Sequence, residues 1–81
     1  MLNMKEQNNY RKKITFDNGY TASIICLGIY SNGGEEGLFE IAILHNDELV
    51  YDTPLTNDVI GHLDFFEVVE VLNKIKNLPP K

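Results

Sequence analysis

The chain has 81 residues, a formal net charge of −5 and a single cysteine. This length predicts one domain, and a lone cysteine excludes an internal disulfide and a cysteine-rich zinc site. The longest apolar run, residues 24–29, is far shorter than the roughly 18 residues of a membrane helix. Together with 43% hydrophobic residues, these features predict a folded protein of a reducing compartment, the cytoplasm.

The charges are segregated along the chain. Residues 14–73 contain eleven Asp and Glu but no Lys or Arg, so this stretch has a formal charge of −11. Phosphate binding depends on Lys and Arg, so we expect no direct contact with nucleic acid. A basic protein partner would instead be attracted to such a surface. A solvated surface that only confers solubility is the alternative reading.

Residues 1–10 are polar and rich in amides, and we expect them to be a flexible lead before one domain over residues 11–81. Residues 11–16 and 20–30 have the alternation of strands, and Asn18-Gly19 predicts a two-residue hairpin turn between them. That turn would place Phe16 opposite Thr21. The core face would then hold five apolar residues: Ile14, Phe16, Ile25, Leu27 and Ile29.

The second half of the chain predicts two further strands and a helix. Residues 31–37 are expected to form a loop, 38–44 a strand, 45–48 a turn and 49–51 a short strand. Thr56 is expected to cap a short helical turn over 57–60. Asp64 and Glu67 have the spacing of a capping box, and the helix should continue to about Asn77, with Phe65, Val68, Val69, Leu72 and Ile75 on its apolar side.

These elements predict an α+β fold, a four-stranded antiparallel β-meander with one C-terminal α-helix packed on one face. Residues 52–61 are the most distinctive stretch of the sequence. They could form a binding loop or a tight connection, and the turn-forming residues favour the connection.

No set of residues has the pattern of a catalytic, cofactor or metal site. The glycine loop over residues 33–37 holds two carboxylates and no Lys, so it does not suit phosphate. His45 and His62 have no compact metal-ligand spacing with nearby acids. Cys26 has no predicted base beside it and is expected to be a small apolar strand residue. We therefore predict a protein that is not an enzyme.

The residues best suited to contact a protein partner are acidic loop residues and tyrosines near strand ends. Tyrosine is favoured in binding surfaces because it buries a large area and keeps a polar tip. Ordinary strand usage is the alternative explanation for these tyrosines. The predicted protein-binding residues are Glu35, Glu36, Glu40, Tyr30, Asp47, Glu48 and Tyr51.

Three segments resemble a family of small phage and prophage accessory proteins. They are residues 16–20 (FDNGY), 37–44 (GLFEIAIL) and 51–61 (YDTPLTNDVIG), and the resemblance covers about residues 14–78. It brings no catalytic residues. It implies a protein of the bacterial host cell that inhibits a host defence or nucleic-acid-handling protein, for example an anti-CRISPR protein.

Two other functions stay open at this point. The chain could be a structural or assembly accessory that acts as a homodimer or a subunit of a phage complex, through an edge strand at residues 11–16 or 49–51. A binder of a small nucleotide signal is the third reading, although the central segment lacks the basic residues that a phosphate would need.

Overall fold

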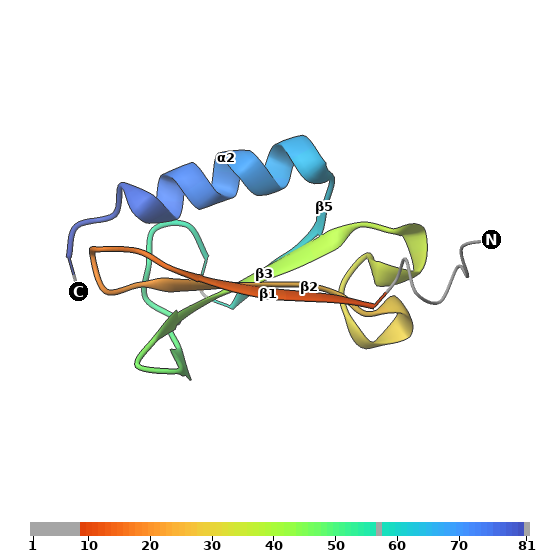
Figure 1. Ribbon diagram of the computed structural model, residues 1–81, viewed down its shortest axis with the longest axis horizontal. Helices are drawn as coiled ribbons and strands as arrows, with labels where there is room; N and C mark the ends of the chain where they lie inside the picture. The colour runs from red at the N-terminus through yellow and green to blue at the C-terminus, as the bar shows by residue number, and fades with distance from the viewer. Residues whose placement is uncertain (1–8, 57, 81) are drawn as a thin grey trace.

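The computed structural model describes residues 9–56 and 58–80, and it is a single antiparallel sheet with one helix lying over one face (Figure 1). The strands β1 to β4 follow one another across the sheet, and β5 also pairs with β3. The α+β class and the C-terminal helix are therefore confirmed. The elements are β1 (Tyr10–Thr15), β2 (Thr21–Cys26), the 3-10 turns η1 (Gly28–Tyr30) and η2 (Gly34–Glu36), β3 (Phe39–His45), β4 (Glu48–Leu49), β5 (Val59–Leu63) and α2 (Phe65–Lys76).

The helical turn expected over residues 57–60 is wrong, because this part of the chain forms the strand β5. Ile60 pairs with Ile41 and Leu63 pairs with Phe39 on β3. The Thr56 hydroxyl accepts a hydrogen bond from the Asp58 N–H at 3.0 Å and so makes a local turn instead of capping a helix. The sheet consequently has a fifth strand, and residues 50–58 connect β4 to it. Asn57 lies outside the described residues.

The first hairpin has a longer loop than expected. The Phe16 N–H donates to the Tyr20 carbonyl at 2.8 Å, and the Gly19 N–H donates to the Phe16 carbonyl at 3.1 Å. Residues 17–19 thus form a three-residue loop, and Gly19, with φ of 94°, supplies the left-handed position that this loop requires. Thr15 therefore pairs with Thr21. The register differs by one residue from the predicted one, which turns the side chains of β2 to the opposite face.

The core face of β2 is therefore not the predicted one. Ala22 and Ile24 are buried against Ile41 and Ile43 of β3, while Ile25 is only half-buried and lies on the face that carries no helix. Strand β2 ends at Cys26, so the expected continuation to residue 30 is also wrong. The last residues of the predicted strand form η1 instead, where Ile29 is 71% exposed.

Helix α2 packs on the core face through a slightly different stripe than expected. Val68, Val71 and Ile75 are buried, whereas Phe65 is 66% and Val69 44% exposed. Both stripes fit a period of 3.6 residues, so the spacing alone does not choose between them. In the described part of the chain, no helix is long and apolar enough to cross a membrane.

Both ends of α2 are fixed by side chains. The predicted capping box is confirmed: the Glu67 N–H donates to Asp64 Oδ1 at 2.8 Å, and the Asp64 N–H donates to Glu67 Oε1 at 2.9 Å. At the other end, Asn18 Nδ2 donates to the carbonyls of Ile75 at 2.8 Å and Leu78 at 3.0 Å. The first hairpin is thereby tied to the end of the last helix.

Candidate protein-binding surface

The loop between β2 and β3 is folded against a bulge in β5. The His62 N–H donates to the Asn32 carbonyl at 3.1 Å, and His62 has a φ of 57°, which is uncommon for a residue other than glycine. A Cβ at Gly33 would lie 2.8 Å from His62 Cα, and one at Gly61 would lie 2.4 Å from the Asn32 Cβ. The close approach of these two segments therefore requires a glycine on each side.

The glycines of this loop have a structural reason. Gly34 is buried, and a Cβ there would lie 2.3 Å from the Gly28 carbonyl oxygen. Glu40 on β3 also holds the loop, because its Oε1 accepts the Asn32 N–H at 2.7 Å. Glu40 is half-buried and engaged within the chain, so it is less suited to a partner than the sequence suggests.

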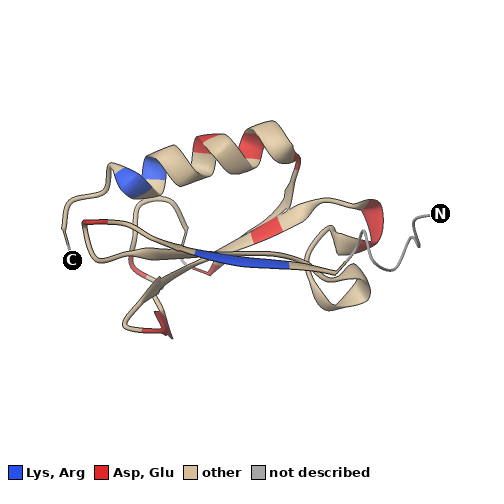
Figure 2. Cartoon of the chain, viewed as in Figure 1, with Lys and Arg blue, Asp and Glu red and all other residues tan. Residues whose placement is uncertain are grey.

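This loop places the acidic residues of η2 beside β5, which leads directly into α2. In Figure 2 the acidic positions of η2 lie at the end of the molecule nearer the N-terminus, and those of α2 lie in the half of the helix that is nearer to this end. Tyr30 is 82% and Phe66 79% exposed, and Glu36 Oε1 lies 3.8 Å from His62 Nε2. We name this set the acidic end; its residues are Tyr30, Glu35, Glu36, Asp64, Phe66 and Glu67.

The other predicted partner contacts lie at the opposite end of β3. Asn46 and Asp47, both with positive φ, form the two-residue turn between β3 and β4. Asp47 Oδ1 lies 3.5 Å from Lys13 Nζ, and both side chains are largely exposed. The seven residues of β3 separate this turn from the acidic end by about 20 Å. The predicted residues therefore form two separate groups.

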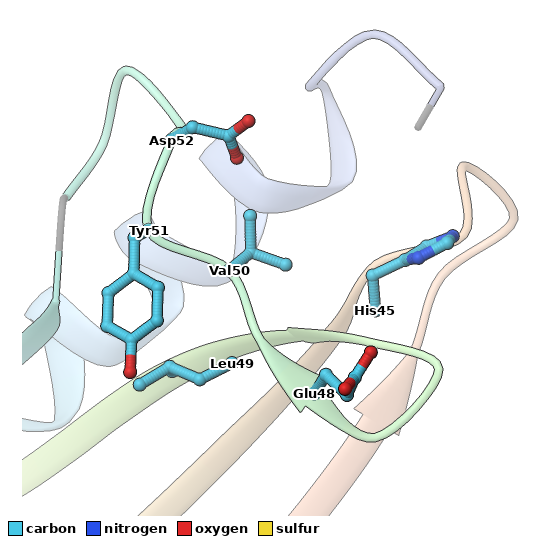
Figure 3. Close-up of a pocket in the computed structure, with 6 residues that line it drawn as sticks. All are labelled: His45, Glu48, Leu49, Val50, Tyr51 and Asp52. Carbon is cyan, nitrogen blue, oxygen red and sulfur yellow. The ribbon is translucent and has the colours of Figure 1, made fainter.

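Glu48 and Tyr51 belong to the second group and line a shallow hollow of about 330 Å³ beside β4. Figure 3 shows that the side chains around it diverge and do not point to a common centre. A ligand site usually combines enclosure with convergent polar groups, and this hollow has neither. It is lined by His45, Glu48, Leu49, Val50, Tyr51 and Asp52.

The groups with metal or nucleophile chemistry are dispersed. Within residues 9–56 and 58–80, no cluster of three or more His, Cys, Asp or Glu side chains could hold a metal ion. Cys26 is 1% exposed and lies with its Sγ 3.9 Å from the Gly34 carbonyl oxygen. Burial raises the pKa of this thiol, which lowers the fraction of reactive thiolate. Cys26 is thus the small buried strand residue that was expected.

We expect Cys26 to react with a thiol reagent roughly 100-fold more slowly in the folded protein than in urea, because reaction requires local opening of the sheet. The absorbance of the thiolate released from Ellman's reagent measures both rates. Similar rates in the two conditions would contradict the burial of this side chain. A peptide containing residues 22–30 is the control for the intrinsic reactivity of the thiol.

The exposed pair at the start of α2 is the part of this surface that sequence reasoning missed. Phe65 and Phe66 are adjacent in a helix, so their side chains point about 100° apart and cannot both enter a narrow core contact. The sequence feature that could have indicated this exposed surface is the pair of aromatic residues directly after the N-cap residue Asp64. It predicts at least one exposed aromatic ring beside Asp64 and Glu67.

Comparison of the chain with protein-family models, with curated proteins and with solved structures finds no match in any of the three. The resemblance to phage accessory proteins accordingly stays a prediction, and the candidate site rests on the residues of this chain alone.

Proposed function

We propose that this protein is a non-catalytic binding protein whose acidic end docks on a basic surface of a partner protein. The observation that carries the proposal is the contact of Glu36 in η2 with His62, which lies just before the acidic first turn of α2. Tyr30 and Phe66 supply apolar area, and aromatic anchors surrounded by polar groups are typical of protein interfaces.

The negative charge of the acidic end would favour basic partner surfaces over nucleic acid. Four carboxylates belong to the acidic end, whereas the described Lys and Arg lie on β1 and in the last turn of α2 (Figure 2). A basic partner surface would be steered toward the acidic end, and complementary charges would raise the association rate. Nucleic acid would be repelled from the same surface.

A basic protein surface with an accessible apolar patch is typical of proteins that bind nucleic acid. The acidic end would compete with phosphates for that surface, so the protein would inhibit its partner by occupying the nucleic-acid site. In the setting implied by the family resemblance, the partner is a host defence or nucleic-acid-handling protein, and anti-CRISPR activity is the most specific version.

We expect the Glu35→Lys/Glu36→Lys variant to lose at least about tenfold in affinity for the partner, since two attractive charges become repulsive. The measurement is a tagged pull-down from a nuclease-treated bacterial lysate at moderate salt, read by mass spectrometry and followed by titration of the purified partner. One basic nucleic-acid-binding protein should be enriched, and its nucleic acid should be displaced by the wild-type chain.

The matched control is Asp17→Lys/Glu48→Lys, which changes the net charge by the same amount at exposed positions outside the acidic end. This variant should keep nearly all of the affinity. Equal losses in both variants would show that only net charge matters, and enrichment of the bait alone would contradict the proposal.

Asp64 and Glu67 are unsuitable for charge reversal because they form the capping box, but Asp64→Asn and Glu67→Gln remove charge and keep hydrogen-bonding groups.

The arrangement of the sheet edges disfavours the homodimer alternative. A second copy pairing through β1 across a two-fold axis would place Arg11, Lys12 and Lys13 against the same basic residues, and like charges directly opposite one another destabilise a strand pair. The other predicted edge, β4, has two residues, which is too short for a stable strand pair.

A further inference from the structure

Among residues 9–56 and 58–80, strand β1 lies at an edge of the sheet. It pairs with β2 on one side, and the strand order places it at the end of the sheet. The Phe16 N–H bonds to Tyr20, and hydrogen-bonded pairs alternate along an antiparallel ladder. The N–H and carbonyl groups of Arg11, Lys13 and Thr15 therefore point away from β2, where an additional strand could bind.

An apolar groove runs beside this edge, between β1 and α2. It has a volume of about 250 Å³. Val69 and Phe65 on α2 are exposed at 44% and 66%, and Tyr10 at the start of β1 at 41%, so the helix leaves part of the sheet edge uncovered. We name this feature the β1–α2 groove; its main apolar lining is Tyr10, Ile14, Phe39, Phe65, Val69 and Leu72.

The charges on β1 indicate what the groove would accept. Arg11 and Lys13 lie on the face away from α2, and Lys12 lies on the groove side. Figure 2 shows β1 as a basic stripe, separate from the acidic end. Lys13 has an exposed ion pair with Asp47, and such pairs are weak enough to be exchanged for another carboxylate. A second copy of β1 would be repelled, whereas an acidic strand would be attracted.

We propose that β1 binds, as an added strand, an extended segment of a partner protein in which apolar residues alternate with Asp or Glu. Successive side chains of such a strand point to opposite faces. The apolar side chains would enter the β1–α2 groove, and the carboxylates would meet Arg11 and Lys13 on the other face. The outward backbone groups of β1 supply affinity and the alternation supplies specificity. This site is independent of the acidic end.

The test begins with a displayed library of random twelve-residue peptides selected against the full chain. We expect the enriched peptides to alternate acidic and apolar residues. The best one, labelled with fluorescein, is then titrated by fluorescence anisotropy. Arg11→Glu/Lys13→Glu should weaken its binding at least tenfold, and so should Val69→Glu at the rim of the groove. Enrichment of peptides without this alternation, or of none, would overturn the proposal.

Two further variants separate strand addition from simple charge attraction. Lys13→Pro removes an outward-pointing N–H, and proline is tolerated on an edge strand; it should abolish binding while the circular dichroism spectrum is unchanged. Lys74→Glu/Lys76→Glu changes charge at exposed positions of α2 and should leave binding unchanged. Retained binding by Lys13→Pro would overturn strand addition. An equal loss in Glu35→Lys/Glu36→Lys would move the peptide to the acidic end and equally overturn the proposal.

Discussion

Replacement of Ile24 by alanine is expected to lower the free energy of unfolding by about 2–5 kcal/mol, whereas Ile25→Ala should lower it by about 1 kcal/mol or less. Ile24 is 4% exposed and packs in the core cluster, but Ile25 is half-buried on the face without a helix. A domain of 81 residues has a total stability of roughly 4–12 kcal/mol. The first change thus removes a large part of that stability.

Urea unfolding followed by far-ultraviolet circular dichroism measures both variants beside the wild type. The two substitutions delete the same atoms from neighbouring residues, so their difference reports only which side chain faces the core. A two-residue loop over Asn18 and Gly19 would reverse the order of the two effects, because it turns Ile25 inward. Equal losses would show that both faces of β2 are covered.

The register could not be predicted from the hairpin sequence alone. Asn-Gly correctly marks the turn, but glycine at its end also fits the three-residue loop that forms. Both faces of β2 carry apolar residues, so alternation does not identify the core side. The core side of β2 is determined by the pairing of Ile24 with Ile41 and of Ala22 with Ile43. This pairing depends on a strand that comes many residues later in the chain.

Features that depend on neighbouring residues were predictable, and features that depend on distant contacts were not. The capping box and β3 follow from spacings of three residues and two residues, and both are found. Strand β5 is short and contains Gly61 and the left-handed His62, so its sequence has no clear strand period. It forms because β3 offers an unpaired side along residues 39–42.

The candidate site divides in the same way. The exposure of Glu35, Glu36 and Tyr30 follows from their place in a polar, glycine-rich loop. The position of this loop against β5, which leads into α2, depends on the close packing of Gly33 against His62, which no sequence spacing reveals. Asp47, Glu48 and Tyr51 were grouped with them by charge and residue type alone, and β3 separates them in space.

Asn18 is the residue whose long-range role is least visible in the sequence, because its place before Gly19 already explains it as a turn residue. Its Oδ1 accepts the Tyr20 N–H at 3.1 Å within the hairpin. Its Nδ2 donates to the carbonyls of Ile75, Lys76 and Leu78 at the end of α2. The Ile75 carbonyl also accepts the Leu78 N–H at 3.1 Å, so the Asn18 side chain adds to the backbone bonds that end the helix and joins the local turn to the position of the helix over the sheet.

We expect Asn18→Asp to lower the free energy of unfolding by about 2 kcal/mol. The aspartate keeps the shape and the acceptor for Tyr20, but it loses the donor, which contributes about 1 kcal/mol, and it places a negative charge at the negative end of the helix dipole. Asn73→Asp is the matched control, since it adds the same charge in the last turns of α2 at an exposed position and should cost about 0.5 kcal/mol.

The same urea experiment measures both Asn variants. Equal losses would mean that the charge alone acts and that the bonds from Asn18 contribute nothing. A larger loss for Asn18→Asp would instead show that the first hairpin holds the C-terminal end of α2.

Because Asp64 and Glu67 fix the other end, the hydrogen bonds from Asn18 also determine how far α2 stands from β1, and hence the width of the β1–α2 groove. Asn18→Asp should then weaken the binding of the selected peptide although Asn18 lies outside the groove.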